Sequence, residues 1–293
     1  MTKAGVYLRL MRPANIVTSV ADVLAGISVS GYFLTENPQI IPVLLLCLST
    51  IGLYGGGIVF NDVFDADLDR IERPERAIPR GEVSLSEAIV FGIVLLMIGV
   101  FAAFALSVLS GVIAFLIAVF ALIYDKFGKH HAFLGPLNMG ICRGLNLLLG
   151  ISIISLSLQS FYFLGLIPLI YIFSITMISQ GEVHGSNRNK LYLGAFLYLL
   201  VISAVLYHSW VQGELILSGL FIILFAYMIY KPLFAAIREP LGKNIGKAVK
   251  AGVISLILMD AAWAAASGFL VGACFIAALL PLSLLLAKRF AVT

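Results

Sequence analysis

The residues best suited to chemistry lie in one short polar stretch, residues 61–81, which reads NDVFDADLDRIERPERAIPRG. This stretch holds six of the fifteen Asp and Glu residues of the chain, and long apolar segments flank it. Asn61, Asp65 and Asp69 are spaced i, i+4 and i+8, so they line one face if the preceding helix continues through them. Asp62 falls close to the same face. Carboxylates held together repel one another, so the spacing favours a bound positive charge.

Mg²⁺ is the cation that this pattern favours, because it takes carboxylate, water and phosphate oxygens as ligands. The predicted metal-binding residues are Asn61, Asp62, Asp65 and Asp69. Arginines in the same stretch suit phosphate oxygens; they are Arg70, Arg73, Arg76 and Arg80. Together these residues predict a diphosphate on an apolar tail, bound at the mouth of a membrane cavity. A salt-bridged surface loop is the alternative, but it explains the arginines and not the spacing of the acids.

The composition predicts an integral membrane protein. The 293 residues are 61% hydrophobic and only 12% charged, whereas an ordinary soluble domain carries about 25% charged residues. The net charge of +4 follows from the placement of basic residues at one membrane face, so we expect no nucleic-acid partner. Cys47, Cys142 and Cys274 lie in apolar segments without the spacing of a disulfide framework or a zinc site.

Apolar segments long enough to cross a bilayer recur along the whole chain. We therefore predict an all-α bundle of nine or ten transmembrane helices that forms one membrane domain, residues 1–293. The basic segment 231–250 is expected to be an interfacial connector. The expected spans are 14–34, 40–62, 84–105, 107–124, 134–156, 160–180, 191–209, 213–230, 244–265 and 267–287.

With ten spans, eighteen of the nineteen Lys and Arg residues fall on one face. The positive-inside rule makes that face cytoplasmic, so the loops that contain the motifs are predicted to be cytoplasmic. Asp22, Arg143 and Asp260 are the ionisable residues inside spans, where a charge costs roughly 2.5 kcal/mol or more. They form an internal ion pair that locks the helices, or line the substrate cavity; the sequence leaves both readings open.

The motif NDVFDADLD resembles the NDxxDxxxD pattern of the UbiA superfamily of intramembrane prenyltransferases, and RAIPRG is similar to the R-P-L-P-x-G continuation of that pattern. Residues 12–15, RPAN, resemble the R-P-x-N that opens the first helix of the family. Tyr124 with Lys126 and Lys129 resembles its Y-x-x-x-K region. The segments ADVLAG, QGEVHGSN and CRGLNLLLG look most like the divergent EboC-like branch.

The resemblance implies a helical bundle with a lateral, lipid-facing cavity. In the family, two Asp-rich motifs hold a polyprenyl diphosphate through Mg²⁺, the diphosphate departs, and the allylic cation alkylates an acceptor, which is often aromatic. Matching positions imply metal or diphosphate roles for Asn61, Asp65 and Asp69. The predicted catalytic residues are Asp65 and Asp69, together with Glu182 and His184 from the region of the second motif. The residues predicted to bind the diphosphate are Arg12, Asn15, Asn61, Arg76, Lys126, Lys129, Arg143, Gln180 and Asn187.

The second Asp-rich motif of the family is altered in this chain. Gln180 and His184 stand at the i, i+4 positions where aspartates are expected, and Glu182 is the carboxylate nearby. Amide and imidazole groups are poorer ligands for Mg²⁺ than carboxylates. The second metal is therefore missing, or Glu182 and Asn187 hold it differently; His184 is also a candidate base toward the acceptor. The remaining possibility is a polar loop that binds nothing.

The sequence thus predicts a Mg²⁺-assisted prenyltransferase whose partners are a polyprenyl diphosphate, an unidentified acceptor and the lipid bilayer. The alternative is a non-catalytic lipid-binding or export factor that keeps the fold and the first motif. A proton-coupled transporter is disfavoured because the sequence shows no clear inverted repeat. Donor length, acceptor identity and oligomeric state are left open.

Overall fold

The computed structural model describes residues 3–129, 131–182 and 185–290, and all regular structure in these ranges is helical. The α-helices are α1 (Lys3–Leu10), α2 (Pro13–Val29), α3 (Ile40–Phe64), α4 (Ala66–Glu72), α5 (Leu85–Leu106), α6 (Val108–Ile123), α7 (Leu134–Ile151), α8 (Ser155–Phe161), α9 (Leu166–Ser179), α10 (Arg188–Val211), α11 (Leu215–Arg238), α12 (Gly242–Ala266) and α13 (Leu270–Arg289). A π turn, Tyr124–Gly128, follows α6, and short 3₁₀ turns occupy Tyr32–Leu34 and Tyr162–Gly165.

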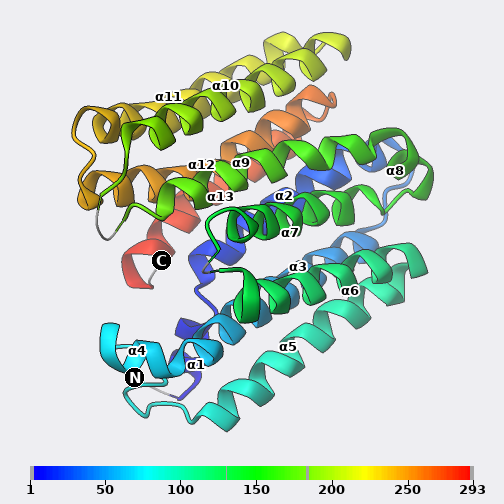
Figure 1. Ribbon diagram of the computed structural model, residues 1–293. Coiled ribbons are helices and arrows are strands. Elements are labelled where there is room, and N and C mark those ends of the chain that lie inside the picture. The colour runs from blue at the N-terminus through cyan, green and yellow to red at the C-terminus, as the bar shows by residue number, and fades with distance from the viewer. Residues whose placement is uncertain (1–2, 130, 183–184, 291–293) are drawn as a thin grey trace.

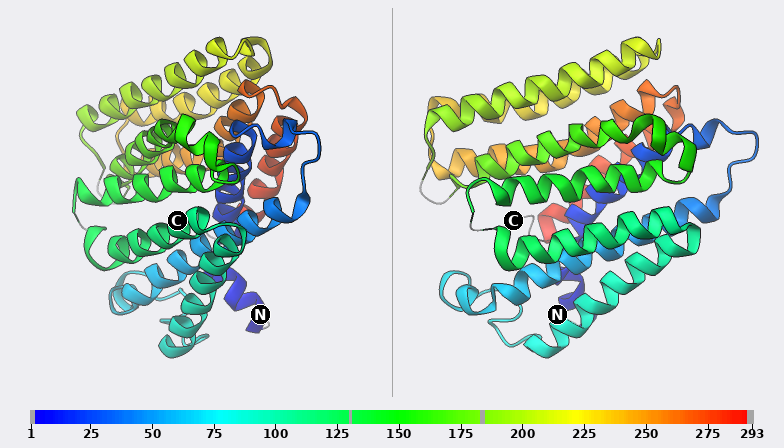
Figure 2. Two further views of the ribbon diagram at one scale, coloured as in Figure 1. Left: turned by 90° about the vertical axis from the view of Figure 1, so that its right-hand side faces the viewer. Right: turned by 45° about the vertical axis from the view of Figure 1, so that its right-hand side comes forward.

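The predicted membrane helical bundle is confirmed. Eight segments within the described residues are long and apolar enough to cross a membrane. The 17-residue α2 and the more polar α7 pack beside each other among them (Figure 1), so each of the ten expected spans corresponds to a helix. The short helices α1 and α4 and the last turns of α13 lie at one end of the bundle, while α8 lies at the other (Figures 1 and 2).

Several helix boundaries differ from the sequence prediction, two of them most clearly. The first span ends at Val29 rather than residue 34, because the chain turns at Gly31, whose positive φ of 80° favours glycine. The prediction of an interfacial connector at 231–250 was wrong. Helix α11 continues through Pro232 to Arg238 and α12 begins at Gly242, so only three residues connect the two helices. Exposed Lys231 donates a 2.8 Å hydrogen bond to the Tyr227 hydroxyl of the same helix, which continues past it.

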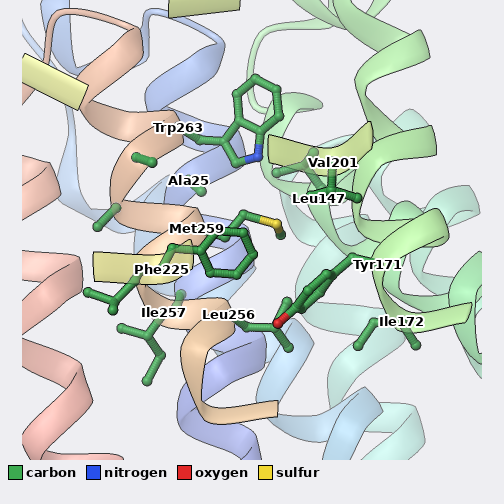
Figure 3. Packing of buried hydrophobic residues seen from close by; sticks show 14 of the residues in the cluster. Ala25, Leu147, Tyr171, Ile172, Val201, Phe225, Leu256, Ile257, Met259 and Trp263 are labelled. Carbon is green, nitrogen blue, oxygen red and sulfur yellow. The ribbon is translucent and has the colours of Figure 1, made fainter. Parts of the chain in front are cut away.

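Helix α12 is the most deeply buried of the long helices, and the large apolar side chains of the core gather around it. Trp263 is fully buried, and the Tyr171 hydroxyl donates a 2.9 Å hydrogen bond to the Gly252 carbonyl of α12. Figure 3 shows Leu256 and Met259 of α12 beside Tyr171 of α9 and Phe225 of α11. The C-terminal helices are thereby joined to α2 and α9 in one core.

Glycines allow α2 and α7 to approach backbone to backbone. A Cβ on Gly150 would lie 2.3 Å from the Val23 carbonyl oxygen, and one on Gly26 would lie 2.3 Å from that of Leu147. Small residues at such contacts are typical of membrane helices. This close packing brings the polar faces of α2 and α7 together deep inside the bundle.

Candidate active site

A cavity of about 430 Å³ opens between α2, α3, α6, α7, α9 and α12. Charged and amide side chains line it where these helices end: Arg12, Asn61, Arg73, Asp125 and Glu182. Further in, the wall is mostly apolar, with Leu53, Ile58, Ile117, Met139, Ile172, Ile175, Val249 and Val253. We call the first set the mouth of the cavity. A charged mouth that leads to an apolar interior suits a molecule with an ionic head and a hydrocarbon tail.

The helix that carries the first motif breaks at Asp65, so Asn61, Asp65 and Asp69 do not lie on one continuous helix. Helix α3 ends at Phe64, Asp65 has non-helical dihedrals (φ −91°, ψ 1°), and α4 begins at Ala66. The Asp65 N–H still donates to the Asn61 carbonyl (3.1 Å) and the Asp69 N–H to that of Asp65 (2.7 Å). The turn is therefore hydrogen-bonded, but the chain changes direction through it (Figure 1).

Two of the four predicted metal-binding residues are held by arginines. Arg76 Nη1 lies 3.1 Å from Asp62 Oδ1 and 2.7 Å from Asp69 Oδ2, and Arg12 Nη2 lies 2.8 Å from Asp62 Oδ1. Both carboxyl groups are buried, and neither lines the cavity. Arg12 has φ 48° and ψ 68°, a left-handed conformation that is strained for an arginine before a proline. In this conformation its side chain reaches Asp62.

Asp65 forms an ion pair with Lys129, the lysine that the sequence analysis placed near the diphosphate. Lys126, predicted for the same role, is exposed and lies over the Phe127 ring at 5.1 Å. Asn61 Nδ2 donates a 2.9 Å hydrogen bond to Asp125 Oδ1. The structure therefore brings Lys129 and Asn61 into the site but turns Lys126 away from it.

Sequence reasoning missed Asp125 and Arg73 as cavity residues. Asp125 is 3% exposed and lies in the π turn after α6, an irregularity that is frequent at functional sites. The sequence does mark Asp125 as a candidate, because it is an acid directly after Tyr124, at the end of an apolar span. Arg73 was noted only as one of four arginines, and nothing in the sequence singled it out.

The altered second motif contributes one carboxylate to the cavity. Glu182 lines the mouth, and its Oε1 atom is buried without a hydrogen-bond partner among the described residues. Burial raises the pKa of Glu182, and the nearby Arg73 partly opposes this shift. Gln180 instead bonds to the Ala132 carbonyl (2.9 Å), outside the cavity lining. Asn187 caps α10 by accepting the Asn189 N–H (3.0 Å), and His184 lies outside the described residues.

Arg143 fits both alternatives that the sequence left open, an internal ion pair and a position in the cavity lining. Its Nε atom lies 2.5 Å from Asp22 Oδ2, so it forms an internal ion pair. It also lines the inner part of the cavity, and its guanidinium lies 5.6 Å from the centre of the Tyr54 ring. Asn15, the last of the residues predicted near the diphosphate, lines the cavity from α2.

A family profile described as the UbiA prenyltransferase family matches residues 23–184, more than half of the sequence. The chain belongs to the UbiA prenyltransferase family. The match covers both motif regions and the helices that carry them. Placement within the EboC-like branch stays a prediction.

Relatives within the UbiA family include digeranylgeranylglyceryl phosphate synthases from archaea. That of Methanosarcina barkeri is 32% identical over 159 residues, which are 51% of this chain and 55% of the relative. That of Saccharolobus solfataricus is 30% identical over 176 residues, 59% of this chain and 60% of the relative. The aligned parts thus span little more than half the length of these relatives.

Solved UbiA structures share the fold over nearly the whole chain. A digeranylgeranylglyceryl phosphate synthase superposes with a TM-score of 0.67 at 26% identity, covering 93% of this chain and 99% of that one. A UbiA homologue from Archaeoglobus fulgidus bound to GPP and Mg²⁺ has a TM-score of 0.60 at 17% identity, covering 86% and 99%. At that identity the second comparison shows the fold alone.

The donor atoms at the mouth of this UbiA-family cavity fit Mg²⁺ in their chemistry. Within the described ranges, no three His, Cys, Asp or Glu side chains are already arranged around one metal position. Oxygen donors nevertheless line the mouth, and the unpartnered Glu182 Oε1 calls for a cation or a proton. The residues that would hold the metal are Asn61, Asp65, Asp125 and Glu182, joined by Asp62 and Asp69 if these leave their arginines.

Proposed function

We propose that this chain is an intramembrane prenyltransferase that transfers an isoprenoid chain from a polyprenyl diphosphate to an acceptor dissolved in the bilayer. The observation that carries the proposal is the cavity, whose mouth is lined by charged and amide side chains and whose interior is mostly apolar. The diphosphate group matches the mouth, and the isoprenoid chain matches the interior. The named activities of the archaeal relatives support the same reaction class.

The ion pairs beside the mouth suggest how the substrate is received. Asp65 pairs with Lys129, and Asp62 and Asp69 pair with Arg76. The carboxylates would hold Mg²⁺, and Lys129 and Arg76 would bind the phosphate oxygens. Each charged side chain would then have a partner of opposite charge both in the empty and in the occupied site, so no buried charge would be left uncompensated.

In the reaction, the bond between C1 of the isoprenoid and the diphosphate oxygen breaks, and negative charge develops on the leaving group. Arg12, Arg73 and Lys129 are positioned to neutralise that charge. Bound Mg²⁺ would act on the same oxygens as a Lewis acid. The Tyr54 and Tyr124 rings line the cavity where they stabilise an allylic cation, and the apolar wall excludes water from it.

Glu182 is proposed as the carboxylate that replaces the second Asp-rich motif. It reaches the cavity, whereas Gln180 bonds to a backbone carbonyl and Asn187 caps a helix. Residues 1–293 are proposed to act as one membrane domain, because α12 packs against α2 and α9. The predicted cytoplasmic location of the mouth belongs to the same proposal. The diphosphate group of the donor is charged and water-soluble, so it reaches the mouth from the aqueous side.

The test is diphosphate release by purified protein in lipid nanodiscs, given Mg²⁺, polyprenyl diphosphates of several lengths and a panel of lipid-soluble acceptors. We expect release that requires both Mg²⁺ and an acceptor. A non-catalytic lipid-binding or export factor is the second candidate, favoured by Gln180 and His184 at the positions of the expected aspartates. Tight donor binding without release under any acceptor would establish that candidate instead. The variant with both Gln180→Asp and His184→Asp would then show whether activity returns.

A further inference from the structure

The inner part of the cavity holds polar side chains that are well separated from the mouth. Thr50, Arg143 and Asn146 line it there, from α3 and α7. Thr50 precedes Asn61 by eleven residues on α3, which corresponds to about 16 Å along a helix. Apolar side chains such as Leu53 and Ile58 line the wall between them. An isoprenoid chain alone gives no reason for polar groups at this depth.

Asn146 has no hydrogen left to donate to a ligand. Its Oδ1 atom accepts a hydrogen bond from the Thr50 hydroxyl at 2.7 Å. Its two amide hydrogens go to Asp22 Oδ2 at 3.0 Å and to the Ser19 carbonyl at 2.9 Å. Asn146 therefore positions Asp22, and a ligand oxygen at this depth needs a donor from another side chain.

Arg143 does have donors to offer. Its Nε faces Asp22, and its Nη2 atom donates to the Thr18 hydroxyl at 2.8 Å. A guanidinium carries five N–H groups, so these two contacts leave hydrogens on the terminal nitrogens. Because Arg143 lines the cavity, those hydrogens are available to a molecule inside it.

The charge of Arg143 is already compensated. Asp22 Oδ1 and both carboxyl oxygens of Asp260 are buried and receive no hydrogen bond from a nitrogen or hydroxyl donor among the described residues. A proton on one of the two carboxyl groups avoids a second buried negative charge opposite a single arginine. The group of Asp22, Arg143 and Asp260 then has no net charge.

We propose that Arg143 binds an uncharged, oxygen-bearing group of the acceptor, such as a hydroxyl or carbonyl, at the inner end of the cavity. This inference rests on the proposed prenyl transfer, and it places Arg143 at the acceptor rather than at the diphosphate, where the sequence predicts it. A neutral oxygen accepts the remaining N–H hydrogens without disturbing the Asp22 pair. A carboxylate or phosphate would bring an uncompensated charge into the membrane interior.

The experiment measures binding of two matched probes to the protein in nanodiscs at pH 7 by ligand-observed NMR. The probes are 4-hydroxybenzamide, which is uncharged, and 4-hydroxybenzoate, which has nearly the same shape and a negative charge. We expect the amide to bind about tenfold more tightly, a difference of roughly 1.4 kcal/mol. The double variant Arg143→Leu with Asp22→Asn removes both charges together, so it should fold and lose this binding. Arg70 is exposed and does not line the cavity, so Arg70→Gln serves as the control and should bind the amide like the wild type.

Binding of geranyl diphosphate with Mg²⁺ to the same samples separates this inference from the proposed function. The wild type and the double variant should bind it equally. The inference is overturned if the carboxylate binds more tightly, if the amide does not bind at millimolar concentration, or if the double variant binds the amide unchanged. It is also overturned if the double variant loses binding of geranyl diphosphate rather than binding of the amide. Failure of the wild type to bind geranyl diphosphate would count against the proposed function alone.

Discussion

Arg76 shows at the scale of single residues how the empty site is kept in order. It contacts Asp62 on α3 and Asp69 on α4, so one guanidinium joins the two sides of the break at Asp65. All three side chains are largely buried. A charge in such surroundings is stable only while its partner is present. The arginine therefore stabilises the motif until a diphosphate replaces the carboxylates.

Arg76→Gln is expected to destabilise the protein by about 3 kcal/mol, because it leaves Asp69 buried without its partner. Arg70→Gln is the matched control, since its 3.0 Å pair with Asp67 is exposed and such pairs contribute about 0–1 kcal/mol. Thermal unfolding in the same detergent compares the two variants. Equal melting temperatures would show that the buried network does not stabilise the motif.

The pKa of Glu182, raised by burial from the usual 4.5, gives a prediction for pH. The folded state holds its proton more tightly than the unfolded state does, so this group favours folding at low pH. Its contribution is lost as the pH rises from 4.5 through the raised pKa. Mg²⁺ needs the carboxylate form, so its affinity should rise over the same range and binding should release a proton.

Glu182→Gln should flatten this pH dependence of Mg²⁺ binding. Calorimetric titrations with Mg²⁺ and a diphosphate, in buffers of different ionisation enthalpy, count the protons released. A Gln variant that releases as many protons as the wild type would assign the titration to another group.

At the scale of elements, the contact between α2 and α7 determines what the inner cavity looks like. Asp22 and Arg143 are 121 positions apart in the sequence, and they meet because Gly26 and Gly150 let the two helices touch. The glycines and the ion pair therefore belong to one packing arrangement. Any change that separates the helices also separates Arg143 from its counter-charge.

Gly150→Ala is expected to destabilise the protein by about 1–3 kcal/mol, because the added methyl group would lie 2.3 Å from the Val23 carbonyl oxygen. Gly219→Ala on α11 is the control. A Cβ there meets nothing within 4 Å, so the substitution should be neutral or stabilise the helix by up to about 1 kcal/mol. Melting temperatures that move together in both variants would contradict this account of the α2–α7 contact.

For the whole molecule, apolar segment length was enough to predict the membrane bundle, since each expected span corresponds to a helix. The break at Asp65 could not be predicted, because the residues around it are as compatible with a continuous helix as with two. The pairing of Arg143 with Asp22 was also out of reach, since it depends on which helices become neighbours. Asp125 was visible as an acid at the end of a span, but only the structure joins it to Asn61.

The measurement that tests the account most directly is Mg²⁺-dependent diphosphate release by the wild type beside two neighbouring variants, Asp65→Asn and Asp67→Asn. Asp65 pairs with Lys129 beside the cavity mouth, whereas the Asp67 side chain is 94% exposed. We predict that Asp65→Asn lowers release by about a hundredfold or more, by loss of metal and transition-state stabilisation, while remaining folded. Asp67→Asn should release diphosphate like the wild type. Full activity of Asp65→Asn, or no release by the wild type with any donor and acceptor, would contradict the proposed function.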